Sequence, residues 1–151
     1  MTVLVLLGLL LSPAATVLAD GSGATTFTQT FHNATQTFVG STFCSGSLAN
    51  ITLTYNGVIH STVNKAGDFW FTATMTGDVY AVTLDASPVT YTGHFTNWFG
   101  GAINNKNMVN DSTFSLHVTG SDGSSFMFHD VAHFSTNANG VVLSFDKPSC
   151  S

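Results

Sequence analysis

The segment STFSLHVTGSDGSSFMFHDVAHFS, which covers Ser112–Ser135, constrains the fold of this chain more than any other. Polar and apolar residues alternate on both sides of Ser121–Gly123, and a period of two is typical of β-strands with one buried face. Gly123 can adopt a positive φ without steric cost. We therefore expect the segment to form a β-hairpin that turns at this tripeptide.

Two loop lengths are possible for this hairpin. A two-residue turn at Asp122-Gly123 would place Leu116 opposite His129, whereas a three-residue loop would place Leu116 opposite Phe128. The longer loop gathers the apolar residues on one face, and a slip of one residue would scatter them. The expected apolar face consists of Phe114, Leu116, Val118, Phe126 and Phe128.

Short alternating segments separated by turn residues recur along the chain. The pairs Asn56-Gly57 and Gly77-Asp78 and the segment 65–68 are each expected to be turns between strands. The Asn- and Gly-rich segment Phe99–Asp111 is expected to be an irregular loop that could cover the mouth of a binding site. After the turn at Gly77-Asp78, the expected apolar face of the next strand consists of Tyr80, Val82 and Leu84.

This spacing of strands and turns predicts an all-β protein without a helix in the mature chain. Eight or nine short strands joined by consecutive hairpins favour a single antiparallel up-and-down β-barrel, because closure removes exposed edges. A two-sheet β-sandwich is the alternative. The expected organisation is a signal peptide at 1–19 followed by one β-barrel domain at 20–151.

The N-terminal residues have the pattern of a secretory signal peptide. Val3–Leu11 is a short apolar segment, and Val17-Leu18-Ala19 fits a cleavage site made of small residues. We therefore expect the mature chain to be secreted, with no membrane association after cleavage.

Charged residues make up only 7% of the chain, which has three lysines and no arginine. Nucleic acid is therefore not an expected partner, because neutralising phosphates requires a basic surface. The sequence contains no phosphate-binding loop, nucleophile elbow or cysteine-rich zinc motif. No cofactor and no metal are predicted.

Cys44 and Cys150 are the only cysteines. An even count in an exported chain indicates one disulfide, which would tie the C-terminus to the first third of the domain. A redox-active pair is the alternative, but the two residues lack the short spacing of a C-x-x-C motif.

Four strings carry a resemblance to other proteins: YNGVIH at 55–60, YTGHFTNWFG at 91–100, FHDVAHF at 128–134 and SFDKPSC at 144–150. Together they resemble a group of small exported bacterial proteins of actinobacterial type that has no assigned function. The resemblance covers most of the mature chain. It implies bacterial export, and it implies no particular activity or catalytic residue.

Histidines are the first candidates for a binding site. If the strand 89–98 pairs with the strand 113–120, then one polar face gathers His94, His117, His129 and His133. Converging histidines can bind a metal ion, but His129 and His133 would lie about 13 Å apart along one strand. The other interpretations are a hydrogen-bonded polar face and a pH-sensitive or acid–base site.

Asp130 is the only carboxylate expected in the middle of a strand, and the predicted register places it on the apolar face. A carboxyl group in such surroundings has a raised pKa and could act as a general acid. A local bulge could instead turn it toward solvent. Trp98 and Phe99 are expected at the entrance of the loop 99–111, where they could gate a pocket or stack on a sugar. Trp70 is expected on the Thr-rich face.

Three functions follow from these features. The first is a secreted β-barrel that binds a small apolar or amphipathic ligand, because thirteen phenylalanines could line its interior. The second is an extracellular structural or adhesive module without a small-molecule site. The third is a barrel enzyme of the isomerase or cyclase kind that uses Asp130 or a histidine, so the sequence leaves open whether the protein is an enzyme.

Overall fold

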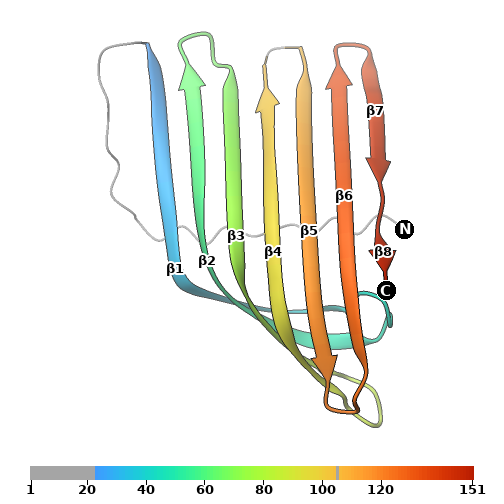
Figure 1. The fold of residues 1–151 in the computed structure, drawn as a ribbon. Coiled ribbons are helices and arrows are strands. Elements are labelled where there is room, and N and C mark those ends of the chain that lie inside the picture. The colour runs from blue at the N-terminus through green and yellow to red at the C-terminus, as the bar shows by residue number, and fades with distance from the viewer. Residues whose placement is uncertain (1–22, 105) are drawn as a thin grey trace.

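The computed structural model describes residues 23–104 and 106–151, so the predicted signal peptide lies outside the described residues. Eight antiparallel strands form one sheet in which β1 to β7 follow each other in chain order, while β8 pairs with β6 (Figure 1). The predicted all-β, up-and-down topology is confirmed. The strands are β1 (Ala24–Ser41), β2 (Leu48–Asn64), β3 (Phe69–Thr83), β4 (Thr90–Ile103), β5 (Met108–Gly120), β6 (Ser125–Asn137), β7 (Gly140–Asp146) and β8 (Ser149–Cys150).

The hairpin of β5 and β6 has the predicted register. Val118 lies opposite Phe126 and Leu116 lies opposite Phe128, as the three-residue loop requires. Gly123 has a φ of 85°, a left-handed conformation that other residues rarely adopt. Local alternation and one turn glycine were therefore sufficient to predict this hairpin.

The pairs Asn56-Gly57 and Gly77-Asp78 are not turns, so these two predictions are wrong. They lie in the middle of β2 and β3, which are continuous strands of 17 and 15 residues. The alternation of β3 continues through Gly77, so Val79 faces the core and Tyr80 is 52% exposed on the opposite face. The predicted apolar face of Tyr80, Val82 and Leu84 is therefore wrong as well.

The mid-strand glycines mark a crease in the sheet. Gly57 lies opposite Met75, Gly77 lies opposite Phe95, and Gly93 lies opposite Val118, so that the glycines run diagonally across β2, β3 and β4. A Cβ on Gly77 would lie 2.6 Å from the Cα of Tyr55, and a Cβ on Gly93 would lie 2.7 Å from the Cα of Val118. Glycine is required here because neighbouring backbones approach too closely for a side chain.

A β-bulge continues the crease into β1. The register of β1 and β2 shifts between Phe31 and Ala34, where Asn33 has a positive φ of 50°. The backbone N–H of Asn33 donates a hydrogen bond of 3.0 Å to the side-chain oxygen of Asn56. The bulge bends β1 together with its neighbours.

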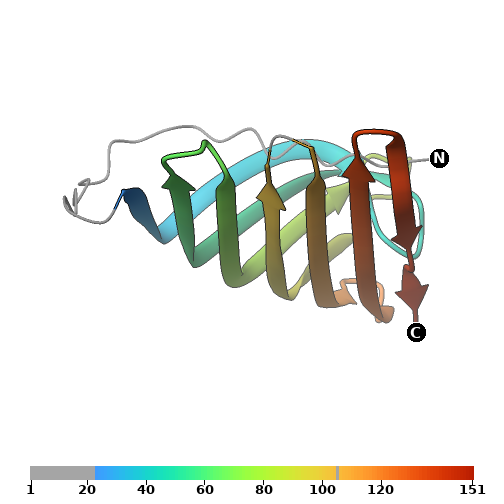
Figure 2. The same cartoon turned by 90° about the horizontal axis from the view of Figure 1, so that it is seen from above.

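The crease divides the sheet into two halves, which lie at an angle to each other (Figures 1 and 2). We call the half next to the connections 42–47, 84–89 and 121–124 the core half. The half next to the turn 65–68, the β4–β5 connection and the turn 138–139 is the hairpin half. The inner face of the core half carries the packed core. Its buried side chains are Ala49, Ile51, Met75, Val79, Ala81, Tyr91, Phe95, Leu116 and Val118.

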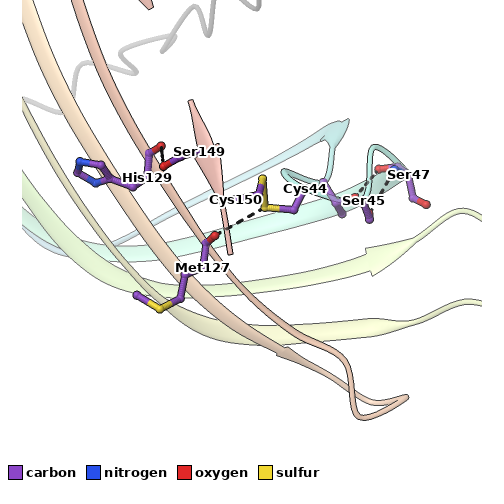
Figure 3. Close-up of a disulfide and its surroundings, with 8 residues drawn as sticks. Cys44, Ser45, Ser47, Met127, His129, Ser149 and Cys150 are labelled. Atoms are coloured by element: carbon purple, nitrogen blue, oxygen red, sulfur yellow. Dashed lines mark hydrogen bonds between the residues drawn. A yellow bond between two sulfur atoms is a disulfide. The ribbon is translucent and has the colours of Figure 1, made fainter. Parts of the chain in front are cut away.

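The connection between β1 and β2 closes the core half. The ring centroid of Phe43 lies 4.4 Å from that of Phe128 on β6 and 5.3 Å from that of Phe114 on β5. Beside this contact, Cys44 forms the predicted disulfide with Cys150 on β8 (Figure 3). The first connection of the sheet therefore reaches across to its last strands.

The closed barrel is not confirmed. Side chains and a disulfide join the two ends of the core half, whereas no ladder joins β1 to β7 or β8 within residues 23–104 and 106–151. The hydrogen-bonded sheet is thus an open meander. The described residues contain no helix that is long and apolar enough to span a membrane.

The segment Phe99–Asp111 is not an irregular loop, which corrects another prediction. It consists of the end of β4, a short connection and the start of β5, and the two strands pair from Phe99–Ser112 to Ile103–Met108. The Asn-rich sequence provides the turn itself, in which the side-chain oxygen of Asn104 accepts hydrogen bonds from the backbone of Lys106 and Asn107.

Candidate functional site

The predicted histidine face exists and lies on the outer face of the sheet, away from the core. His94 lies directly opposite His117, which confirms the proposed pairing of β4 with β5. His129 lies opposite Ser115, and its Nδ1 is 2.9 Å from the Ser115 hydroxyl. Strand alternation thus placed these side chains on one face, as predicted.

A groove of about 550 Å³ crosses this outer face over β2, β3, β4 and β5. Two rows of side chains line it, and the strand register places each row straight across the four strands. Its floor includes Val79 and Gly93, which belong to the crease. One row consists of Thr54, Asp78, His94 and His117, and the other consists of Tyr80 and three threonines.

Hydrogen bonds hold the imidazole of His94 on two sides. Its Nδ1 lies 3.2 Å from Oδ1 of Asp78, and its Nε2 lies 2.9 Å from the hydroxyl of Thr76. A carboxylate only accepts hydrogen bonds, so Nδ1 carries the proton and Nε2 accepts from the hydroxyl when the ring is neutral. The side chains of His94 and Asp78 are 59% and 83% exposed, so both remain accessible to a ligand.

The hydroxyl of Thr76, the imidazole of His94 and the carboxylate of Asp78 are connected in the same order as the groups of a catalytic triad. Acyl transfer further requires backbone N–H groups directed at the developing oxyanion. Thr76 lies within β3, between β2 and β4. The backbone N–H groups of this strand form the hydrogen bonds that pair it with its two neighbours. The two contacts orient the imidazole ring of His94.

A metal site is not supported by this geometry. Among the described residues, no three side chains of His, Cys or Asp are grouped closely enough to hold one ion. His133 lies apart from the groove, where its Nδ1 is 2.6 Å from Oδ1 of Asp111 and its ring stacks on Phe145. Its side chain is only 19% exposed. The four predicted histidines thus share a face without forming one site.

Trp98 and Phe99 do not gate a loop, because both lie within β4. Trp98 is 42% exposed on the outer face, and its ring lies beside Gly100. Phe99 points to the inner face, where its ring is 6.1 Å from that of Phe71 and packs against the core. Trp70 is 45% exposed on the outer face, as predicted.

Phe99 belongs to a set of apolar side chains on the inner face of the hairpin half. Small residues lie next to these apolar side chains on the neighbouring strands: Gly101 is opposite Phe71, and Ser112 is opposite Phe99. Ile103 in this set is 43% exposed. We call this set the inner patch, and it consists of Phe69, Phe71, Phe99, Ile103, Met108 and Phe134.

Asp130 borders the inner patch and lies opposite Phe114, as the predicted register requires. Its Oδ1 is buried and has no hydrogen-bond partner among the described residues. Desolvation raises the pKa of Asp130, and the nearby Asp146 carboxyl raises it further by hydrogen bonding and charge repulsion. No bulge turns this carboxyl group away, so it remains the candidate for an acid–base or binding role.

Sequence reasoning missed Asp78 and Tyr80 as residues of the outer face. The predicted turn at Gly77-Asp78 interrupted the strand, which removed Asp78 from the row of His94 and inverted the face of Tyr80. The available signal was the alternation of Thr72, Thr74, Thr76, Asp78 and Tyr80, which continues unbroken across Gly77.

Comparison of the chain with protein-family models, with curated proteins and with solved structures finds no match.

Proposed function

We propose that the protein is exported and binds a small apolar or amphipathic ligand against the inner patch. Export is supported by the pattern of residues 1–19 and by the Cys44–Cys150 disulfide, since disulfides persist in oxidising compartments. The actinobacterial resemblance of the sequence agrees with export from a bacterium.

The observation that carries the binding proposal is the juxtaposition of the inner patch with Asp130. The ring of Phe71 covers Gly101, and the smaller Ser112 and Ala132 lie beside Phe99 and Phe134, so this face offers apolar surface to the body of a ligand. At the border, the carboxyl group of Asp130 lies among apolar side chains, and a ligand that reached its buried Oδ1 would supply the hydrogen bond that this atom lacks among the described residues. A ligand with an apolar body and one hydroxyl or amine group fits this combination.

Native mass spectrometry of the protein purified from the medium of its own host tests the proposal. A retained adduct of a few hundred daltons is expected. Ser112→Phe fills the inner patch and should abolish the adduct, whereas Thr113→Phe places the same side chain on the outer face and should retain it. A bare polypeptide, or equal retention by both variants, would refute binding at the inner patch.

An enzyme of the isomerase or cyclase kind is a second candidate, which the raised pKa of Asp130 favours. A carboxyl group that stays protonated at higher pH can donate a proton to a bound substrate. If the adduct proves to be a substrate, Asp130→Asn should abolish its turnover while the adduct is still retained. Loss of the adduct itself in Asp130→Asn would assign the carboxyl to binding alone.

An adhesive module is a third candidate, and the edge of β1 favours it. This strand has 18 residues, carries no charged side chain and pairs only with β2 among the described residues. Uncharged edges accept further strands readily. Concentration-dependent assembly without any adduct would support this function over ligand binding.

A further inference from the structure

The outer groove is a second surface with its own chemistry, separate from the inner patch. Strand alternation places the polar row of the groove on the opposite face of the sheet from the inner patch. Its volume of about 550 Å³ is that of a site for one small molecule or a short segment of a polymer.

The polar row of the groove offers both kinds of hydrogen-bonding group. Asp78 is 83% exposed and accepts hydrogen bonds, while the imidazoles of His94 and His117 can donate or accept. The contacts of His94 with Asp78 and Thr76 fix the orientation of its ring before any ligand binds. Prealigned groups of this kind suit a ligand that carries several neighbouring hydroxyls.

The second row of the groove is partly apolar. The ring of Tyr80 is 52% exposed and stands between threonines of the adjacent strands, Thr52 and Thr92. An exposed aromatic ring among methyl and hydroxyl groups provides a flat apolar surface with a polar rim. The C–H face of a sugar ring has the complementary character, because its hydroxyls lie around an apolar face.

The charge of the groove excludes anionic ligands. No lysine lines it, and Asp78 would repel a phosphate or sulfate. The net charge of −5 for the whole chain acts in the same direction. Among uncharged ligands, the hydrogen-bonding groups of the polar row favour one that is rich in hydroxyls.

We propose that the outer groove binds a neutral saccharide, with one sugar ring stacked on Tyr80 and its hydroxyls bonded to Asp78, His94 and His117. The side chains come from three neighbouring strands that are hydrogen-bonded in register, so the groups already lie side by side before a ligand binds. This site is independent of the inner patch, and either can fail without the other.

The test is a titration of the mature protein with defined oligosaccharides, namely linear hexamers of β-linked and of α-linked glucose. Binding is followed by calorimetry and by the NMR signals of the histidine rings. Saturable shifts are expected for His94 and His117, with no shift for His133, which lies outside the groove. The absence of saturable binding by either hexamer would refute the proposal.

Two variants locate the site. Tyr80→Ala should raise the dissociation constant about tenfold, which corresponds to about 1.4 kcal/mol. Trp70→Ala removes another exposed aromatic ring from the same face of β3 and should leave the constant unchanged. Equal losses in both variants, or tighter binding of a sulfated hexamer than of the neutral one, would overturn the assignment.

Asp78→Asn provides a second measurement that does not depend on the stacking surface. It preserves the shape of the side chain but removes its charge, which weakens the hydrogen bond that it accepts from Nδ1 of His94. We expect weaker binding of the same hexamer together with a changed chemical shift of the His94 ring. Unaltered affinity would show that the polar row does not contact the sugar.

Discussion

Gly93 and Val118 lie directly opposite each other on β4 and β5, and the Cα of Val118 is only 2.7 Å from the place that a Cβ on Gly93 would occupy. This close approach belongs to the crease that folds the core half against the hairpin half. It explains why a residue without a side chain is needed in the middle of an otherwise regular strand.

Gly93→Ala should therefore destabilise the protein by about 1–3 kcal/mol, because the backbone must move to accept the methyl group. Gly100→Ala on the same strand is the matched control, since the nearest atoms there lie 3.1–3.4 Å away. Urea unfolding measures both free energies. Equal unfolding midpoints for the two variants would contradict a role of Gly93 in the crease.

Asp130 should make the protein less stable as the pH rises above about 4. Burial raises its pKa in the folded state above the ordinary value of 3.8. At a pH between 3.8 and this raised pKa, the folded chain holds a proton that the unfolded chain has lost. The free energy of unfolding then falls with pH, by at most about 1.4 kcal/mol per pH unit for one proton. Asp130→Asn should flatten this slope.

The control for this slope is Asp122→Asn. Hydrogen bonds from Ser124 lower the pKa of Asp122 below 3.8, so its contribution to stability is complete above that value and is lost only at lower pH. The slope above pH 4 should therefore persist in Asp122→Asn. A slope that is unchanged in Asp130→Asn would show that another group causes it.

Removal of the Cys44–Cys150 disulfide should lower the free energy of unfolding substantially. The bond links residues 106 positions apart, and a loop of about 100 residues corresponds to a loss of about 4.7 kcal/mol in the chain-entropy model. Urea unfolding of the double variant Cys44→Ser/Cys150→Ser measures the loss. Reductant should destabilise the wild type to the same extent and leave the double variant unaffected, and any other pattern would assign the effect to the substitutions themselves.

A positive charge on β1 should suppress association between copies of the protein. Ala24–Asn64 contains no charged residue, so the free edge of β1 lacks the lysines that commonly protect edge strands. Thr30→Lys places a charge on this edge, whereas Thr74→Lys makes the same change in the centre of the sheet. Light scattering at increasing concentration should show less assembly for Thr30→Lys alone, and equal behaviour of the two variants would exclude the edge as the cause.

Local patterns in the sequence were informative where they depend on neighbouring residues alone. Alternation around Ser121–Gly123 predicted the register of β5 with β6, the inward position of Asp130 and the common face of His117 and His129. These relationships follow from the two-residue period of a strand and from one turn, so no distant part of the chain is needed to establish them. The same argument holds for the outward position of Trp70.

The glycines show where local patterns stop being sufficient. Gly57 and Gly77 have the flanking residues of turns, but they serve as points of close approach between strands. Glycine suits both purposes for the same reason, the absence of a side chain, so the sequence alone does not distinguish them. The error at Gly77 also removed Asp78 and Tyr80 from the predicted site.

The sequence by itself thus determined the antiparallel all-β class, the disulfide and the common face of His94, His117, His129 and His133. The tertiary structure decided that the sheet folds along a crease, that Phe43 closes the core half from the opposite end of the chain, and that Asp78, His94 and His117 form one row. The physical reason is the range of the interactions involved. The face of the sheet on which a side chain lies depends on adjacent residues. The rows of side chains across strands, the crease and the closing of the core half depend on the register and coiling of strands that are distant in sequence.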